Sequence, residues 1–227
     1  IENLVNEAAI LAARLNKRSV GMDEFQEAIE RVVAGPERRS RLISEQEKKI
    51  IAYHESGHAL VQLNMPYSDP VHKVSIVARG MAGGYTLTLP ADDTHLYSKN
   101  KFEDQLAGLL GGRVAEEIAF GDVTTGASDD LRRATQIARA MITEYAMSQT
   151  LGQRTFGEKE ELIFLGREIS EQRDYSEEVA SEIDREMKML IDRAYERAKD
   201  VLETNREQLD AIANRLIEKE TLEAPEL

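Results

Sequence analysis

The sequence predicts a mainly α-helical fold with a small β-sheet near the middle of the chain. Apolar residues recur every three or four positions through most of the 227 residues, which is the period of an amphipathic helix. Two short stretches depart from it, because "HKVSIVAR" (72–79) and "YTLTLP" (85–90) alternate apolar with polar residues. Such alternation, on either side of "GMAGG", predicts two strands joined by a glycine-rich connection. The length suits one main domain and a smaller attachment.

Two helices are predicted before the main domain. The first covers about 3–17, and the second follows "SVGMDEF", where Asp23 is the expected N-cap. "AGPERRSR" then interrupts the pattern with Gly35-Pro36 and a basic cluster. This break is either a domain boundary or an ordinary helix C-terminus, whose dipole basic residues also suit. We take it as a boundary, which divides the chain into 1–34, a linker at 35–43 and a main domain at 44–227.

The main domain is expected to begin with a helix near Ser44, whose hydroxyl and Glu47 form a capping box. Helical periodicity returns after the strands at about 101–120, again at about 129–147, and in a long segment at about 176–219. The apolar stripe of this last segment predicts core or subunit packing.

Composition excludes several classes of function. The chain has 29 basic and 42 acidic side chains and a net charge of −13, so it repels nucleic acid. It has no cysteine, which excludes disulfides and leaves only His, Asp and Glu as strong metal ligands. Its apolar runs are too short to cross a bilayer. Because it opens in mid-helix without Met, we expect a fragment whose targeting or membrane segments are missing.

The stretch "AYHESGHALV" (52–61) carries two of the four histidines in the chain. Residues four apart share one face of a helix, so His54 and His58 can direct two imidazole nitrogens at one ion. Glu55 lies roughly 100° around the helix from His54, near enough to reach a water on that ion. Zinc lowers the pKa of such a water to about 7, and a neighbouring carboxylate can take its proton and return it to a leaving amine. The motif H-E-x-x-H therefore predicts two zinc ligands and a general base.

The simpler alternative is that three polar residues share a helix by chance. Their neighbours are apolar, however, so unpaired polar side chains would be buried at a cost that a metal ion removes. Gly57 lies inside the motif, where a helix-interior glycine costs about 1 kcal/mol relative to alanine. Its presence predicts close packing against another backbone.

A catalytic zinc usually has three protein ligands and an open fourth position, so a third ligand must come from elsewhere. His95 lies in a polar stretch typical of a solvated loop, and Glu117 follows Arg113 at the spacing of an intrahelical ion pair. Asp129 and Asp130 suit the positive end of a helix as well as a metal. The sequence alone leaves all of these open, together with His72 and Glu116.

Several further motifs occur in order along the chain: "ISEQEKKIIAYHESGHALV", "DPVHKVSIVARG", "GGYTLTLP", "LLGGRVAEEIAFGDVTTGASDDLRRATQIARAM" and "YSEEVASEID". Together they closely resemble the FtsH family of ATP-dependent zinc metalloproteases, over essentially the whole chain. The first two helices resemble the end of an AAA+ ATPase lid and its linker. The resemblance thus implies a mainly α, helical zinc-metallopeptidase domain with a small β-sheet at 44–227, preceded by a two-helix remnant of an AAA+ lid at 1–34.

The resemblance also implies a third zinc ligand. In the family it is the second acidic position of a Gly-Ala-Ser-Asn-Asp segment, which is Asp130 here. This chain has Asp129 where the family usually has Asn, and a second carboxylate would compete for zinc or raise its neighbour's pKa. The family's "AEE" carboxylate corresponds to Glu116, a candidate to orient a ligand histidine from outside the ligand set. Zinc is thus expected on His54, His58 and Asp130, with Glu55 as the catalytic base.

The implied function is the peptidase part of a membrane-anchored, ATP-dependent zinc metalloprotease that hydrolyses peptide bonds of unfolded or membrane proteins. The resemblance implies a homo-hexamer, ATP binding only in the full-length protein, and attachment to the bacterial inner (plasma) membrane through segments missing here. The protease domain is expected on the cytoplasmic side, and the fragment itself is expected to be soluble. A substrate is expected to add as a strand to an exposed sheet edge, around 74–77 or 85–89.

Two other functions compete with this one. A zinc-stabilised oligomerising scaffold without proteolytic activity would have no need of a base, so the intact Glu55 argues against it. A freestanding secreted metallopeptidase is disfavoured by the absence of a signal peptide and of cysteine.

Overall fold

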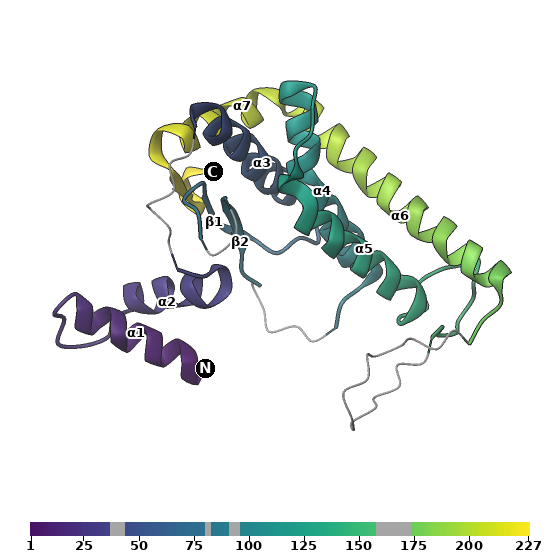
Figure 1. The fold of residues 1–227 in the computed structure, drawn as a ribbon, viewed down its shortest axis with the longest axis horizontal. Coiled ribbons are helices and arrows are strands. Elements are labelled where there is room, and N and C mark those ends of the chain that lie inside the picture. The colour runs from purple at the N-terminus through teal and green to yellow at the C-terminus, as the bar shows by residue number, and fades with distance from the viewer. Residues whose placement is uncertain (37–43, 80–82, 91–95, 158–173) are drawn as a thin grey trace.

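The computed structural model of the protein describes residues 1–36, 44–79, 83–90, 96–157 and 174–227. They form a helical main body with one small sheet, and a helical pair that lies to one side of it (Figure 1). The pair consists of α1 (Glu2–Arg14) and α2 (Met22–Ala34). The main body contains α3 (Glu45–Leu63), α4 (Lys99–Phe120), α5 (Ser128–Thr143), α6 (Glu177–Thr204) and α7 (Arg206–Lys219). The prediction of a mainly α fold with a small sheet is confirmed.

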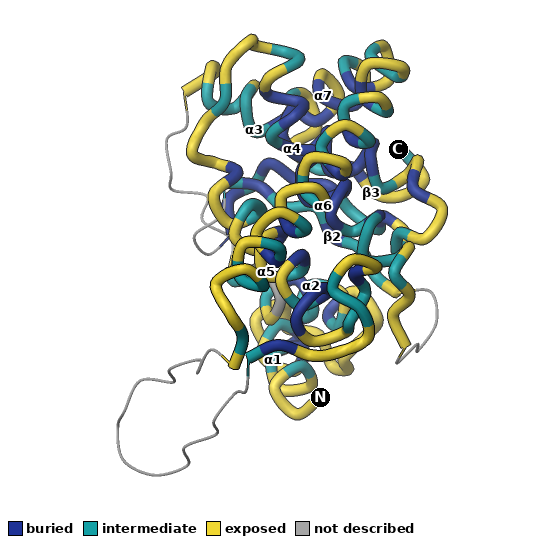
Figure 2. The backbone as a smooth tube through the Cα atoms, turned by 90° about the vertical axis from the view of Figure 1, so that its right-hand side faces the viewer, coloured by how far each residue is buried: buried dark blue, intermediate teal, exposed yellow. Residues whose placement is uncertain are grey.

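α3 is the central helix of the main body, since every residue from Ala52 to Val61 is buried. α4 packs against it and contributes Leu106 and Leu110 to a core that side chains of α5, α6 and α7 complete. Figure 2 shows buried backbone in α3 and α4 and exposed backbone on the outer helices. A helix buried on all sides carries its polar side chains into the core, where each needs a partner.

Serine side chains begin several helices of the main body. The Ser44 hydroxyl accepts from the Glu47 N–H at 3.1 Å, which is the Ser44 half of the predicted capping box, and Ser98 and Ser176 cap α4 and α6 in the same way. The prediction for Asp23 is wrong. The N-cap of α2 is Gly21, whose N–H donates to Glu24 at 2.9 Å, because Asp23 already lies within the first turn.

The sheet is antiparallel with the order β2-β1-β3, formed by β1 (Val71–Ser75), β2 (Tyr85–Thr88) and β3 (Thr221–Glu223). The two expected strands are confirmed, and β3 is an addition from the C-terminus. Val74 of β1 pairs with Thr86 on one side and with Leu222 on the other. The expectation of an exposed edge at 74–77 is therefore wrong for β1, which is the central strand, whereas β2 lies at an edge.

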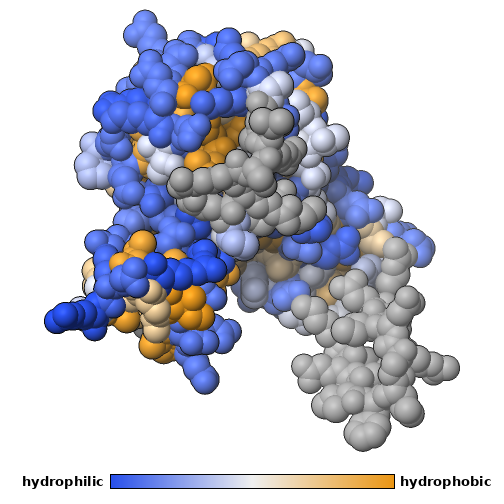
Figure 3. Space-filling model, turned by 60° about the vertical axis from the view of Figure 1, so that its left-hand side comes forward, coloured by the Kyte–Doolittle hydropathy of each residue, from blue (hydrophilic) through white to orange (hydrophobic). Residues whose placement is uncertain are grey.

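The helical pair contacts the main body through acidic side chains of α2. Glu30 is buried and pairs with Lys73 of β1, and it accepts a hydrogen bond from the Tyr85 hydroxyl of β2 at 2.8 Å. The surface of this N-terminal part is otherwise apolar, since residues 1–34 hold half of the large exposed apolar side chains among the described residues. They give the hydrophobic surface at the lower left of Figure 3. Of the expected linker at 35–43, residues 37–43 lie outside the described residues.

Within the described ranges, no helix combines the length and the apolar character needed to span a lipid bilayer.

Candidate metal centre

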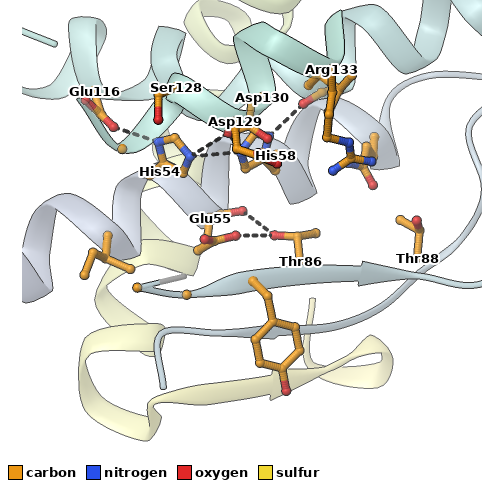
Figure 4. Close-up of a pocket in the computed structure, with 18 of the residues that line it drawn as sticks. His54, Glu55, His58, Thr86, Thr88, Glu116, Ser128, Asp129, Asp130 and Arg133 are labelled. Atoms are coloured by element: carbon orange, nitrogen blue, oxygen red, sulfur yellow. Dashed lines mark hydrogen bonds and ion pairs between the residues drawn. The ribbon is translucent and has the colours of Figure 1, made fainter. Parts of the chain in front are cut away.

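His54 and His58 lie one helical turn apart on α3, with ring centroids 4.7 Å apart. Their Nε2 atoms are 3.0 Å apart, and the two residues are only 8% and 7% exposed. The burial expected from their apolar neighbours is thus present, and both imidazoles direct one nitrogen to the same point (Figure 4).

The other nitrogen of each imidazole makes a hydrogen bond that fixes its tautomer. His54 Nδ1 lies 2.7 Å from Glu116 Oε1, and His58 Nδ1 lies 2.8 Å from the carbonyl oxygen of Gly108. Because both partners are acceptors, both Nδ1 atoms donate, and each neutral imidazole keeps a lone pair on Nε2. Two lone pairs 3.0 Å apart repel each other unless a proton or a cation lies between them.

Asp130 supplies the third acceptor from the first turn of α5. Its Oδ2 lies 3.4 Å from both His54 Nε2 and His58 Nε2. Among the described residues, these three side chains are the only group of His, Asp and Glu close enough to hold one metal ion. Asp129 takes a different direction, since its side chain is 59% exposed and pairs with Arg132.

Glu116 connects this cluster to the segment before α5. Its Oε1 accepts from His54, while its Oε2 accepts from the N–H of Thr124 at 2.6 Å. Thr124 is the N-cap of the short 3-10 turn η1 (Thr125–Ala127), which leads directly into α5. One buried carboxylate of α4 therefore orients a histidine and also fixes the approach of the helix that carries Asp130.

The electrostatics of the cluster favour a positive charge at its centre. Burial disfavours the imidazolium of His54, but hydrogen bonds with Asp130 and Glu116 outweigh burial and raise its pKa to about 10. Burial also disfavours the ionised form of Asp130, but hydrogen bonds from His54 and His58 hold its pKa well below the usual range. Burial likewise disfavours ionised Glu116, but hydrogen bonds from His54 and from the Thr124 N–H outweigh burial and lower its pKa. A site that holds a proton this strongly is also attractive to a divalent cation, which competes for the same lone pairs.

Glu55 lies beside the histidines and is 7% exposed. Burial raises its pKa, and the electrostatic effect of the neighbouring His58 and His54 rings opposes that shift. Thr86 of β2 donates its hydroxyl to Glu55 Oε2 at 2.8 Å, a contact that the sequence did not reveal (Figure 4).

Glycines of α3 and α4 make the space for this arrangement. A Cβ on Gly57 would lie 2.3 Å from the carbonyl oxygen of Gly111, which confirms the close backbone packing predicted for Gly57. A Cβ on Gly112 would lie 2.6 Å from the Nε2 atoms of both His54 and His58. Two adjacent glycines in a helix, Gly111 and Gly112, indicate close packing in the sequence. Sequence spacing alone does not show that Gly112 faces the histidines.

The cluster opens into a cleft of about 930 Å³. Residues of β2, Thr86 and Thr88 among them, form one wall, and the segment 67–69 with Lys101 and Gln105 of α4 forms another. Glu55, both histidines and Asp130 all line the cleft, so a ligand in it would reach each of them.

The remaining sequence candidates lie elsewhere. Glu117 is exposed and accepts a hydrogen bond from the Tyr195 hydroxyl at 2.6 Å. His72 lies on β1 and is absent from the cleft lining. His95 lies outside the described residues.

The sequence of the chain is similar to those of known proteins. The sequence model described as Peptidase family M41 matches residues 41–227. The chain is 60% identical over its whole length to the ATP-dependent zinc metalloprotease FtsH 1 of Sphaerobacter thermophilus and to that of Thermomicrobium roseum. It is 54% identical to the ATP-dependent zinc metalloprotease FtsH of Thermotoga maritima. The chain covers 35% of the length of the first two relatives and 37% of the third, so it spans little more than a third of each.

Proposed function

The chain belongs to peptidase family M41, and from this premise we propose that it is the peptidase part of an ATP-dependent zinc metalloprotease. The observation that carries the proposal is the convergence of His54, His58 and Asp130 on one point beside Glu55. Membership of a peptidase family supports hydrolysis of peptide bonds and gives no support to a scaffold without activity.

His54, His58 and Asp130 suit zinc by their chemistry. Two neutral imidazole nitrogens and one carboxylate are a common ligand set of a catalytic zinc site, and both Nδ1 atoms have the outer hydrogen bonds that such ligands require. Glu116 orients His54 in this proposal and is not itself a ligand. Zinc bound there would supply Lewis acidity, which lowers the pKa of a water to about 7 and polarises a peptide carbonyl.

Glu55 is the general base of the proposed reaction. Its carboxylate takes a proton from the attacking water and then gives a proton to the leaving amine as the peptide bond breaks. Glu55 is buried beside the histidines and lines the cleft, so its carboxylate can reach a water held there.

The edge of β2 is the proposed binding site for an extended polypeptide substrate. Among the described residues, β2 pairs with a strand on one side only, and its residues line the cleft next to Glu55. Strand addition would use the backbone groups of this edge and would therefore tolerate many substrate sequences.

ATP dependence and zinc appear in the names of the similar proteases. We propose that residues 1–34 are the end of an AAA+ lid, that 35–43 are a linker, and that 44–227 are the peptidase domain. The longer protein is then a homo-hexamer anchored in the bacterial inner membrane, with this part on the cytoplasmic side and unfolded or membrane proteins as substrates.

A Glu55→Gln variant of the intact, zinc-loaded protein tests the proposed function. Gln keeps the size of the side chain but cannot take a proton, so casein cleavage should fall by at least about a hundredfold. The zinc content should stay at the wild-type value, because Glu55 is not a proposed ligand. Cleavage by this variant at the wild-type rate would show that Glu55 is not the base, and a wild type with one zinc per chain but no cleavage would favour a scaffold.

A further inference from the structure

The hydroxyl of Thr86 contacts the carboxylate proposed above as the general base. Its Oγ1 lies 2.8 Å from Glu55 Oε2 and 3.3 Å from the backbone carbonyl oxygen of the same residue. A hydroxyl has one proton to donate, and the carboxylate is both the nearer and the more negative acceptor. The hydrogen bond to the side chain is therefore the stronger of the two contacts, which Figure 4 draws together.

The strand that carries Thr86 is fixed on both of its faces. Thr86 pairs with Val74 of β1, and successive side chains of a strand point to opposite faces. The preceding residue, Tyr85, donates its hydroxyl to Glu30 of α2 at 2.8 Å. A one-residue slip of β2 would exchange these faces and break both contacts, so the position of Thr86 is well determined.

Gly84, the residue just before β2, confines the same carboxylate. A Cβ on Gly84 would lie 2.9 Å from Cγ and from Oε1 of Glu55, so only glycine leaves room for the side chain there. Within the part of the chain that the structure describes, Oε2 accepts the Thr86 hydrogen bond and Oε1 accepts none. One oxygen is thus held while the other keeps its lone pairs.

We infer that Thr86 is a positioning residue, whose hydroxyl fixes the Glu55 carboxylate through Oε2 and leaves Oε1 to accept the proton. The inference rests on the proposed function, because it requires Glu55 to be the base. Holding the base matters because a displacement of about 1 Å from the productive geometry can cost roughly a hundredfold in rate. β2 also borders the cleft, so one strand places the base relative to the substrate.

Two substitutions distinguish the effect of the Thr86 hydroxyl from the effect of the shape of its side chain. Thr86→Val keeps the β-branched shape that suits a strand but removes the donor, whereas Thr86→Ser keeps the donor. The readouts are kcat and KM for a short fluorogenic peptide, which needs no unfolding, together with zinc content and thermal stability of the intact protein. We expect Thr86→Val to lower kcat roughly 10- to 100-fold with little change in KM. Thr86→Ser should keep most of the wild-type kcat, and both variants should keep one zinc per chain.

Thr221→Val is the matched control, because it makes the same change on β3 at the far edge of the sheet. It should leave kcat unchanged. A Thr86→Val variant with the wild-type kcat would overturn the inference and leave the proposed function intact. Equal losses of kcat in the Val and Ser variants, in step with lost zinc or lost thermal stability, would overturn it as well, since the donor would not be the cause. Glu55→Gln measured in parallel separates the two failures, because full activity of that variant would overturn the proposed function itself.

Discussion

Two carboxylates approach His54 from opposite sides of its ring, and the geometry assigns them different tasks. Glu116 contacts Nδ1, the nitrogen that points away from the shared centre, whereas Asp130 lies near Nε2. A group on Nδ1 can fix the tautomer and raise the basicity of the ligand, but it cannot reach an ion on Nε2. A group that lies 3.4 Å from both Nε2 atoms can bind such an ion directly. The two carboxylates should therefore differ in their effect on zinc affinity.

Substitutions of these carboxylates test the ligand assignment. Glu116→Gln should weaken zinc binding about 10- to 100-fold, as expected for an outer hydrogen-bond partner. Asp130→Ala should weaken it by more, because a direct ligand is lost. Zinc affinity measured by competition with a chelator gives the comparison. A larger loss in the Glu116 variant than in the Asp130 variant would exchange the two roles.

Asp129 provides the matched control for that experiment. It is adjacent to Asp130 in sequence, but its side chain is exposed and pairs with Arg132. Asp129→Asn, which restores the residue usual in the resembled family, should change zinc affinity by less than about twofold, because a screened exposed pair is worth only about 0–1 kcal/mol. A clear rise in affinity would instead show that Asp129 competes for the ion.

At the scale of elements, the site depends on how closely α3 approaches α4. Gly57 and Gly111 face each other without side chains, and this lets the backbones meet directly. The close approach brings the Gly108 carbonyl oxygen within 2.8 Å of His58 Nδ1 and places Gly112 over both imidazoles. The contacts that pack α3 against α4 therefore also orient the two imidazoles.

Alanine substitutions on α4 test this packing. A Cβ on Gly111 would lie 2.6 Å from the backbone oxygen of Gly57, so Gly111→Ala should force the helices apart and destabilise the fold by about 1–3 kcal/mol. Gly108→Ala is the control on the same helix, because the three atoms nearest to its Cβ all belong to the Gln62 side chain, which can rotate. It should cost less, since alanine also gains about 1 kcal/mol of helix propensity. Urea unfolding midpoints rank the stabilities of the two variants. Equal decreases in the midpoint would show that the backbone contact between Gly57 and Gly111 is not critical.

Much of this architecture follows from local sequence patterns, and the rest depends on contacts distant in sequence. Helical periodicity and the Ser44 cap locate α3, and the four-residue spacing of His54 and His58 already requires a shared face. β3 was not predicted, because a three-residue strand at 221–223 has no local periodicity and forms only by pairing with β1. Spacing alone could not choose Asp130 over its neighbour either, since that choice depends on the direction in which α5 begins. Thr86 was missed for the same reason, because its partner Glu55 lies 31 residues away.

At the scale of the whole molecule, α2 and β2 connect the N-terminal helical pair to the cleft. Glu30 of α2 is 3% exposed and lies among Lys73, Arg79 and Tyr85 of the main body. Tyr85 is adjacent to Thr86, so the strand that contacts the proposed base also contacts the helical pair. A change in how α2 sits on the sheet would therefore act directly on the wall of the cleft.

The Glu30 cluster should make the stability of the protein depend on pH in a defined window. Burial disfavours ionised Glu30, but hydrogen bonds from Lys73 and Tyr85 outweigh it and lower its pKa below the ordinary 4.5. Burial likewise opposes the charge on Lys73, but its bonds to Glu30 and Glu223 raise its pKa above the ordinary 10.5. The pair therefore stabilises the fold fully between about pH 4.5 and 10.5. Its contribution is lost as the pH falls through the folded-state pKa of Glu30 or rises through that of Lys73.

Glu30→Gln should remove this contribution, because it leaves the buried Arg79 and the partly buried Lys73 without their shared carboxylate. Loss of one partner of a buried ion pair costs on the order of 3 kcal/mol, so the thermal midpoint at pH 7 should fall clearly below that of the wild type. The difference between the two proteins should shrink as the pH falls below 4.5 and through the lower folded-state pKa of Glu30, below which Glu30 is protonated in the folded wild type as well. Glu203→Gln, an exposed change on α6, should leave the midpoint unchanged at every pH. A Glu30→Gln difference that stayed constant down to pH 3 would show that shape, and not charge, holds α2 on the sheet.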